Sequence, residues 1–237
     1  MGDSESGIVL HHLEDSRSHR ILWLLEELEV PYTIKEYKRL PNKQAPPELR
    51  KVHPLGKAPV ITDGGRTFAE SGLIIEYLIG RYGEDKFGVK RDVNSEAWID
   101  NTFFIHYSEG SVQPNLLQRA LGTVVVKEVP FFVRPFARLI FGKIDEAATS
   151  PDLERHGQLI EAQLTKVESK GGWLAGAGHP TSADFMMSIT LQIFLKDAPE
   201  YAGPKTKEYV KRIQERPAYK KVLALPGGSL DFLYTES

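Results

Sequence analysis

A short turn of hydroxyl and charged side chains follows the first apolar segment of the chain. Asp15, Ser16, Arg17 and Ser18 come after the strand-like stretch 7–12, and a helix is predicted at 17–29. The N-terminus of a helix leaves backbone N–H groups without partners, and such groups bind anions. A serine hydroxyl beside them adds a hydrogen-bond donor. The turn therefore predicts an anion-stabilising site, with a plain helix cap at Ser16 as the alternative.

The sequence contains no cysteine, which excludes disulfides, thiolate metal ligands and cysteine nucleophiles. Any sulfur chemistry must therefore use the sulfur of a small molecule. The seven histidines form no HExxH motif and no helical i, i+4 pair, so we expect no metal site. The serines belong to no G-x-S-x-G elbow, and no Ser-His-Asp triad is implied.

The composition is that of an ordinary globular protein, with 237 residues, 41% hydrophobic and 26% charged. A formal net charge of −2 gives no reason to expect general attraction to nucleic acid or to an acidic membrane. We expect no membrane span, because no stretch has about 18 uninterrupted apolar residues. The first residues, MGDSESG, lack the apolar core of a secretion signal, and we expect a cytoplasmic protein.

Strand and helix patterns alternate over the first third of the chain and then give way to helices alone. The N-terminal order is β-α-β, a connection, and then β-β-α, and the first two strands should be parallel. The predicted elements are strand 7–12, helix 17–29, strand 31–38, a short helix within 40–55, strand 58–62, strand 66–69 and a helix from 70 to 82. Beyond a polar linker the predicted helices are 93–121, 131–170, 182–196, 205–214 and 217–224.

This pattern predicts two domains, an α/β domain over 7–84 and an all-helical domain over 94–230, joined by the linker 85–93. In the second domain, Thr181 and Asp184 have the spacing of a capping box at a helix start, with Asp in place of the usual Glu. We assign that pair to folding and not to chemistry.

Three segments carry a resemblance to a known family. HPLGKAPVI (53–61) followed by FAESGLIIEYL (68–78) resembles the N-terminal domain of cytosolic glutathione transferases. Together with DSRSHRILWLLEEL (15–28) they look most like the serine-type fungal and bacterial members abbreviated GTT, over about residues 7–224. The resemblance implies a thioredoxin-like domain followed by an all-helical one, a homodimer, and glutathione as the co-substrate, with no metal.

In this family a hydroxyl stabilises the thiolate of glutathione, whose pKa of about 8.5–9 leaves it mostly protonated at neutral pH. The family pattern aligns Ser16 with the active-site serine, and Ser18 is the alternative. Either one would donate a hydrogen bond to sulfur and would not act as a nucleophile. Arg17 would add positive potential.

The resemblance also implies how glutathione is held. It assigns a cis peptide bond to Pro59, so that Ala58 pairs with the peptide as an added strand would. The alternative is an ordinary trans proline at the start of a strand. Ser71 is expected both to cap its helix and to bind the γ-glutamyl carboxylate, with Glu70 near other polar groups.

A basic window over 35–57 fits the two carboxylates of glutathione, although most of its side chains are expected only to face solvent. The family alignment points to Gln44 and Lys57 near the glycyl end, with Lys43 beside them. Glu109 lies where other members place an acid that reaches the glutathione amine of a neighbouring subunit.

The second substrate is expected to bind in the helical domain. Aromatic residues cluster on its first long helix and in VPFFVRPFARLIF (129–141). Such spacing fits a core, a dimer contact, a pocket for an apolar electrophile or a membrane surface.

The leading hypothesis is a detoxifying glutathione transferase that conjugates glutathione to small hydrophobic electrophiles, with peroxidase activity on organic hydroperoxides as a further reaction. The alternatives are a non-catalytic, ligandin-type binder of apolar ligands and a transferase-like interaction module. A glutathione-dependent thiol reductase of the usual kind is excluded, because it needs a cysteine.

Overall fold

The computed structural model describes residues 7–225, 228 and 230. Its N-terminal part is a four-stranded mixed sheet with the order β2-β1-β3-β4, made of β1 (Ile8–Leu13), β2 (Tyr32–Tyr37), β3 (Val60–Asp63) and β4 (Arg66–Ala69). Strand β1 is parallel to β2 and antiparallel to β3, and β3 is antiparallel to β4. The predicted βαβ-ββα order is confirmed.

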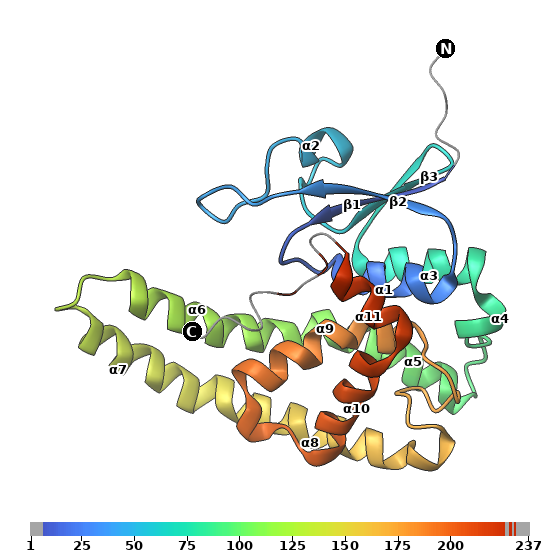
Figure 1. Cartoon of the computed structure of the whole chain (residues 1–237). Helices are drawn as coiled ribbons and strands as arrows, with labels where there is room; N and C mark the ends of the chain where they lie inside the picture. The colour runs from blue at the N-terminus through green and yellow to red at the C-terminus, as the bar shows by residue number, and fades with distance from the viewer. Residues whose placement is uncertain (1–6, 226–227, 229, 231–237) are drawn as a thin grey trace.

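Two helices, α1 (His19–Leu28) and α3 (Ser71–Tyr82), lie between the sheet and the helical part of the chain (Figure 1). Their apolar residues pack under the sheet, and Ile21, Leu22, Leu24 and Leu25 of α1 have no exposed surface. The opposite face of α1 is buried as well, because it packs against the helical part, where Trp23 meets Phe185 at 4.5 Å between ring centroids. A helix covered on both sides explains a segment this rich in leucine.

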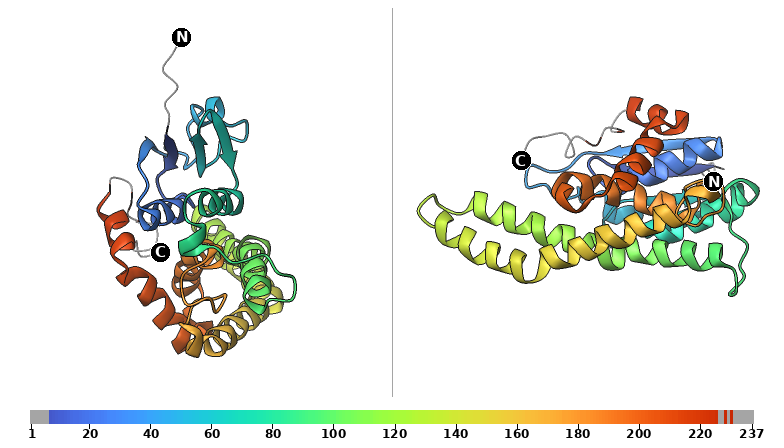
Figure 2. Two further views of the ribbon diagram at one scale, coloured as in Figure 1. Left: turned by 90° about the vertical axis from the view of Figure 1, so that its right-hand side faces the viewer. Right: turned by 90° about the horizontal axis from the view of Figure 1, so that it is seen from below.

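The rest of the described chain is helical, as predicted. Its elements are α4 (Glu84–Phe87), α5 (Glu96–Tyr107), the π-helix η1 (Ser108–Val112), α6 (Gln113–Glu128), α7 (Arg134–Ile144), the π-helix η2 (Asp145–Thr149), α8 (Ser150–Lys166), α9 (Ser182–Asp197), α10 (Pro204–Glu215) and α11 (Pro217–Ala224), with α2 (Leu49–Val52) and the short 3-10 turns η3 (Glu168–Lys170) and η4 (Pro199–Tyr201) in loops. Helices α6 and α7 run side by side and extend well beyond the other helices (Figure 2).

Two of the predicted helix boundaries are wrong. The helix expected to end at 121 continues as α6 to Glu128, where it packs beside α7. Pro130 then ends it, since the residue before a proline avoids the helical region. The single helix expected over 131–170 is divided into α7, η2 and α8.

The predicted capping box at the start of α9 is confirmed. The Asp184 carboxylate accepts hydrogen bonds from the Thr181 backbone N–H at 2.7 Å and from the Leu174 N–H at 3.0 Å, and also from the Tyr209 hydroxyl. This fully buried carboxylate therefore ties together the start of α9, the loop before it and α10.

One cluster of buried apolar side chains runs from the sheet into the helical part. It joins Leu10 and Leu24 of the first part to Phe185, Tyr219 and Val222 of the second. The division into domains over 7–84 and 94–230 stays a prediction, and residues 226, 227 and 229 of the second range lie outside the described residues. Within the described residues, no helix is both long and apolar enough to cross a bilayer.

His19 lies buried where α1 meets α11, with its ring centroid 5.1 Å from that of Tyr219. Burial, followed by the nearby charge of His12, lowers the pKa of His19 from 6.5 to about 3. Between those values the unfolded chain binds a proton at this residue and the folded chain does not. The free energy of unfolding should therefore fall as the pH decreases below about 6.5, by at most about 1.4 kcal/mol per pH unit from this residue.

Urea unfolding at about pH 7 and about pH 5 measures this effect. His19→Phe keeps an aromatic ring against Tyr219 and should lose less stability between the two pH values than the wild type. His106→Gln, which replaces an exposed histidine of α5, is the matched control and should retain the wild-type loss. Equal losses in all three proteins would contradict the assignment.

Candidate functional site

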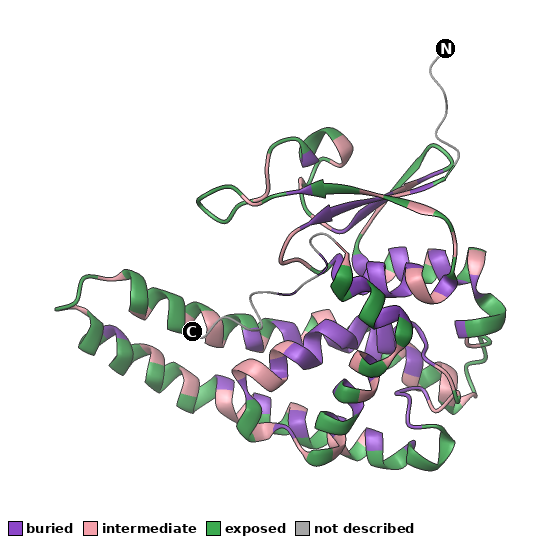
Figure 3. Ribbon diagram, in the orientation of Figure 1, coloured by how far each residue is buried: buried purple, intermediate pink, exposed green. Residues whose placement is uncertain are grey.

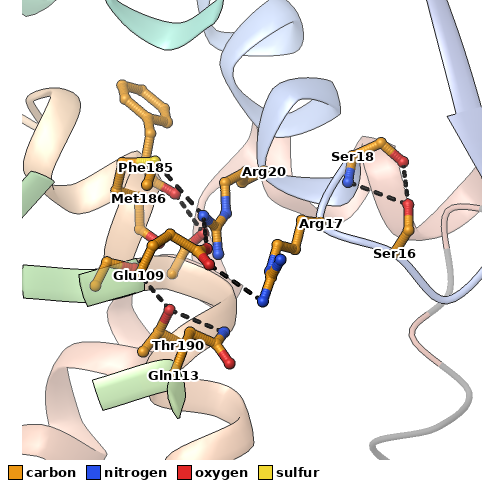
Figure 4. Close-up of polar contacts among 11 residues, drawn as sticks. Ser16, Arg17, Ser18, Arg20, Glu109, Gln113, Phe185, Met186 and Thr190 are labelled. Atoms are coloured by element: carbon orange, nitrogen blue, oxygen red, sulfur yellow. Dashed lines mark hydrogen bonds and ion pairs between the residues drawn. The ribbon is translucent and has the colours of Figure 1, made fainter. Parts of the chain in front are cut away.

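The turn between β1 and α1 holds two serine hydroxyls in contact (Figure 4). The Ser16 hydroxyl donates to the Leu13 carbonyl at 2.6 Å, lies 2.6 Å from the Ser18 Oγ and accepts the Ser18 backbone N–H at 3.2 Å. Ser16 is half-buried and Ser18 is fully buried. Ser18, and not Ser16, is the N-cap residue of α1, and its side chain makes no capping hydrogen bond. The Ser16 hydroxyl nevertheless accepts a backbone N–H at the start of the helix, so the choice between a thiolate donor and a helix cap at Ser16 stays a prediction.

Counting protons gives the direction of the hydrogen bonds in this turn. Each serine hydroxyl has a single proton to donate. Because Ser16 donates to Leu13, the contact between the two hydroxyls requires Ser18 to donate to Ser16. The Ser18 Oγ also lies 2.7 Å from His12 Nδ1 and 3.4 Å from the Leu13 carbonyl; with its proton on the short contact to Ser16, the contact with His12 requires His12 to donate. The hydrogen bonds run from His12 through Ser18 to Ser16, and His12 carries a proton on Nδ1.

A buried ion pair links the same turn to the helical part. Arg20 has no exposed surface, and its Nη1 donates to Glu109 Oε1 at 2.7 Å. Arg17 Nη2 lies 3.1 Å from the other oxygen, Oε2 (Figure 4). Burial lowers the pKa of Arg20, and the charge and hydrogen bond of Glu109 raise it again. Glu109 stands in the π-helix η1, an insertion of the kind found at functional sites.

This arrangement bears on two expectations from the sequence. Arg17 was expected to add positive potential beside Ser16; the single carboxylate of Glu109 contacts both Arg17 and Arg20, so the cluster keeps a net positive charge, and the role of Arg17 stays a prediction. Glu109 was expected to reach glutathione in a neighbouring subunit, and here both of its oxygens bind arginines of its own chain.

The sheet brings three of the predicted segments to one end. Leu13, before the serine turn, ends β1, and His11 of this strand pairs with Val60, which follows Pro59. Val60 in turn pairs with Ala69, which precedes Glu70 and Ser71. Three segments therefore lie at the same end of the sheet, as binding of one ligand requires: the serine turn, the Ala58–Pro59 segment and the start of α3.

Two of these segments have unusual backbone geometry. The Ala58–Pro59 peptide bond is cis, as expected. Glu70 has a φ of 73°, in the left-handed region, and occupies the N-cap position of α3. The expectation that Ser71 caps this helix is therefore wrong, since Ser71 is its first residue and is buried. Strained backbone of this kind is often retained at ligand sites.

The basic loop is attached to the turn by a residue that we did not predict. Arg39 donates to the Asp15 carbonyl at 2.8 Å and to the Lys43 carbonyl at 2.9 Å, and its backbone N–H donates to Glu14 Oε1 at 2.7 Å. Gln44 is exposed in this loop, next to Lys43. Lys57 is exposed beside Ala58. No contact joins Gln44 to Lys57, and their assignment stays a prediction.

A cavity of about 810 Å³ lies elsewhere. It is formed by α6 and α7 and is lined by Leu117, Leu121, Phe141 and Ile144, among others, but by none of the predicted site residues. Of the aromatic residues expected in a core or pocket, Phe104 and Tyr107 are buried, whereas Phe131, Phe132 and Phe136 are exposed. Those three are therefore not part of a core in this chain.

Comparison with known proteins identifies the fold and the family. A family model described as Glutathione S-transferase, N-terminal domain, matches residues 5–80. The chain is 32% identical over 222 residues to Glutathione S-transferase 1 of Saccharomyces cerevisiae, an alignment that covers 90% of this chain and 92% of that protein. The chain belongs to the glutathione transferase family.

Solved structures agree with this assignment. A glutathione S-transferase from Actinobacillus pleuropneumoniae aligns over 97% of both chains with a TM-score of 0.69 and 31% identity. A glutathione transferase homolog from Lodderomyces elongisporus, with two glutathione molecules per subunit, aligns over 91% of this chain and 97% of that one with a TM-score of 0.68. Its identity is 19%, so that likeness concerns the fold alone. The thioredoxin-like domain and the helical domain of the family are both present, and the sequence resemblance is confirmed.

Three residues of this candidate site were not singled out from the sequence, namely His12, Arg20 and Arg39. Arg20 stands inside an otherwise apolar helix, and a charged residue there could have signalled a buried ion pair. His12 and Arg39 carry no such local signal, since their contacts depend on the turn between them. Within the described residues, no three side chains of the His, Asp and Glu types gather as a metal site.

Removing the charge of Glu109 should destabilise this protein through Arg20. Glu109→Gln keeps the size of the side chain and leaves a buried guanidinium without its counter-ion, a change that costs about 3 kcal/mol. Glu200→Gln, which weakens an exposed pair with Arg119, is the control and should cost less than about 1 kcal/mol. Urea unfolding measures both variants. A loss at Glu109 no larger than that at Glu200 would show that the buried pair is unimportant.

Proposed function

We propose that this protein is an active glutathione transferase in which Ser16 stabilises the thiolate of glutathione for attack on small hydrophobic electrophiles. The observation that carries this proposal is the serine turn. Ser16 is the half-exposed end of a hydrogen-bonded series, beside the first turn of α1 and at the sheet edge where Ala58–Pro59 and Ser71 also lie. A hydroxyl donor at a helix N-terminus favours a thiolate over a thiol.

The chemistry needs only a small movement of one proton. When the sulfur arrives, the Ser16 hydroxyl turns from the Leu13 carbonyl to the thiolate, and the thiol proton goes to solvent. The Ser16 oxygen still accepts hydrogen bonds from the Ser18 N–H and hydroxyl, which strengthens it as a donor. Each unit by which the thiol pKa falls corresponds to about 1.4 kcal/mol. The thiolate then forms a carbon–sulfur bond and the leaving group departs. With an organic hydroperoxide it attacks the terminal oxygen instead: the O–O bond breaks, the alkoxide leaves and takes a proton to become the alcohol, and a second glutathione reduces the resulting sulfenic acid to the disulfide with release of water.

The three segments at the sheet edge provide contacts for the rest of the tripeptide. The backbone of Ala58, beside the cis Pro59, pairs with the peptide as an added strand would. The start of α3, with Ser71 and Glu70, binds the γ-glutamyl group. Gln44 and Lys57 bind the glycyl carboxylate. The enzyme works in the cytoplasm as a homodimer.

A non-catalytic binder of apolar ligands is the second candidate, and the apolar cavity of about 810 Å³ between α6 and α7 favours it. Measuring glutathione turnover distinguishes the binder from the transferase. A binder takes up apolar ligands without consuming glutathione, and a transferase consumes it.

Ser16→Ala should retain glutathione binding and lower kcat/KM for conjugation to an aryl halide at least about tenfold, the size of one lost hydrogen bond to a charged group. Ultraviolet absorbance of bound thiolate should show a raised thiol pKa in this variant. Ser95→Ala, at the N-cap of α5, is the control and should retain the wild-type rate. An unchanged rate in Ser16→Ala would refute this role of Ser16, and absence of glutathione turnover in the wild type would refute the enzyme.

His12 should act through Ser18 as a positioning residue. His12→Leu removes the Nδ1 donor, so the Ser18 hydroxyl loses the hydrogen bond that it accepts and becomes a weaker donor to Ser16, and Ser16 in turn becomes a weaker donor to sulfur. We expect kcat to fall about three- to tenfold, with the KM for glutathione nearly unchanged and the thiol pKa raised. His12→Asn, which places a donor near the position of Nδ1, should restore most of the rate.

The double variant of His12→Leu and Ser18→Ala tests whether the two act in series. If they do, it should lose little more than the larger single loss, because both remove the same hydrogen-bond direction. Additive losses would contradict a series. An unchanged thiol pKa in His12→Leu would show that His12 contributes only packing contacts and does not act on Ser16.

A further inference from the structure

The outer half of the α6–α7 hairpin stands away from the rest of the molecule. We call residues 121–144 the arm; it contains the end of α6, the connecting turn and all of α7. Figure 2 shows it extending past the other helices, and most of its surface is exposed in Figure 3. The arm contains no residue of the candidate site, so an inference about it does not depend on the proposed catalysis.

Large apolar side chains cover the arm. Phe131 and Phe132 in the turn are 79% and 71% exposed, and Phe136 and Leu139 of α7 are 65% and 60% exposed. Ile140 and Ile144 continue the α7 stripe at helical spacing. The three phenylalanines alone expose on the order of 400 Å² of apolar surface, about the size of the largest patch on a typical monomeric protein.

The charge of the arm is opposite to that of the whole chain. The arm has Lys127, Arg134, Arg138 and Lys143 against the single acid Glu128, a net charge of +3, whereas the chain has a net charge of −2. The overall charge therefore conceals a basic region. Arms with the same positive charge repel one another, which argues against pairing of two arms. Exposed phenylalanine beside lysine and arginine suits a surface that is anionic outside and apolar beneath.

We propose that the arm docks on the surface of an anionic lipid bilayer. Phe131 and Phe132, at the end of the hairpin, enter the boundary between head groups and acyl chains, and the stripe of α7 lies along it. Lys127 and Arg138 meet the lipid phosphates. An interfacial element buries its apolar side about 5–10 Å deep, so the turn and one side of α7 suffice and the rest of the protein stays in water.

Co-sedimentation of the full chain with vesicles tests this directly. Vesicles of phosphatidylcholine containing about one third phosphatidylserine should bind the protein, vesicles of phosphatidylcholine alone should bind it far less, and added salt should weaken binding. The double variant of Phe131→Ser and Phe132→Ser should bind at least about tenfold more weakly. Val93→Ser, which removes an exposed apolar side chain of the linker, should bind as the wild type does.

A double charge-reversal variant tests the electrostatic contribution to vesicle binding. The double variant of Lys127→Glu and Arg138→Glu should abolish the preference for phosphatidylserine. Lys207→Glu with Lys220→Glu makes the same change in net charge on α10 and α11, outside the arm, and should keep that preference. Thermal unfolding checks that each variant is folded; all four arm residues lie at or near the surface, and the melting temperature should change little.

Three results would overturn the proposal. The wild type could fail to sediment with the anionic vesicles. The phenylalanine variant could bind as well as the wild type. Or sedimentation velocity could show that the phenylalanine variant loses an oligomeric state that the wild type has without vesicles, in which case the arm contacts a second copy of the chain.

Discussion

The burial of α1 on both faces is the constraint on which the rest of the structure depends. One face of the helix carries leucines that fill the space under the sheet, and the other places Trp23 against Phe185 and His19 against Tyr219. Its first residues close the serine turn. Any movement of α9 or α11 against α1 would therefore displace Ser16 in the serine turn. The ion pair of Arg20 with Glu109 resists such movement.

The turn itself is governed by the number of protons available. His12, Ser18 and Ser16 each donate one hydrogen bond to the next group in the series, and the Leu13 carbonyl accepts the hydrogen bond of Ser16. Because every donor in the series is fixed, the single adjustable hydrogen bond is that of Ser16. A hydroxyl so placed can change its acceptor from a carbonyl to an anionic ligand with little rearrangement of its neighbours, which is the condition for electrostatic preorganisation.

The sequence was enough to predict the βαβ-ββα order of elements, the helical second part and the capping box at Thr181, because each depends on nearby residues, whereas the cis bond at Pro59 was predicted from the family resemblance. The failures came where a distant contact decides the outcome. The helix predicted to end at 121 runs on to Glu128, where it packs beside α7. The single helix predicted over 131–170 is divided by the π-helix η2. Ser71 suggested a cap, but the left-handed backbone at Glu70 moves the helix start by one residue.

The apolar cluster that joins the sheet helices to α9 and α11 has a consequence for how the molecule can be divided. The segment that the N-terminal family model matches is not a separable module, since cutting the chain after it would leave Trp23 and its neighbours facing water. Fragments would be expected to aggregate, and chimaeras that exchange one half between relatives would have to exchange the contacting surface of α9 and α11 as well. Sequence changes in the two halves are therefore coupled, because each half covers the apolar surface of the other and keeps it from water.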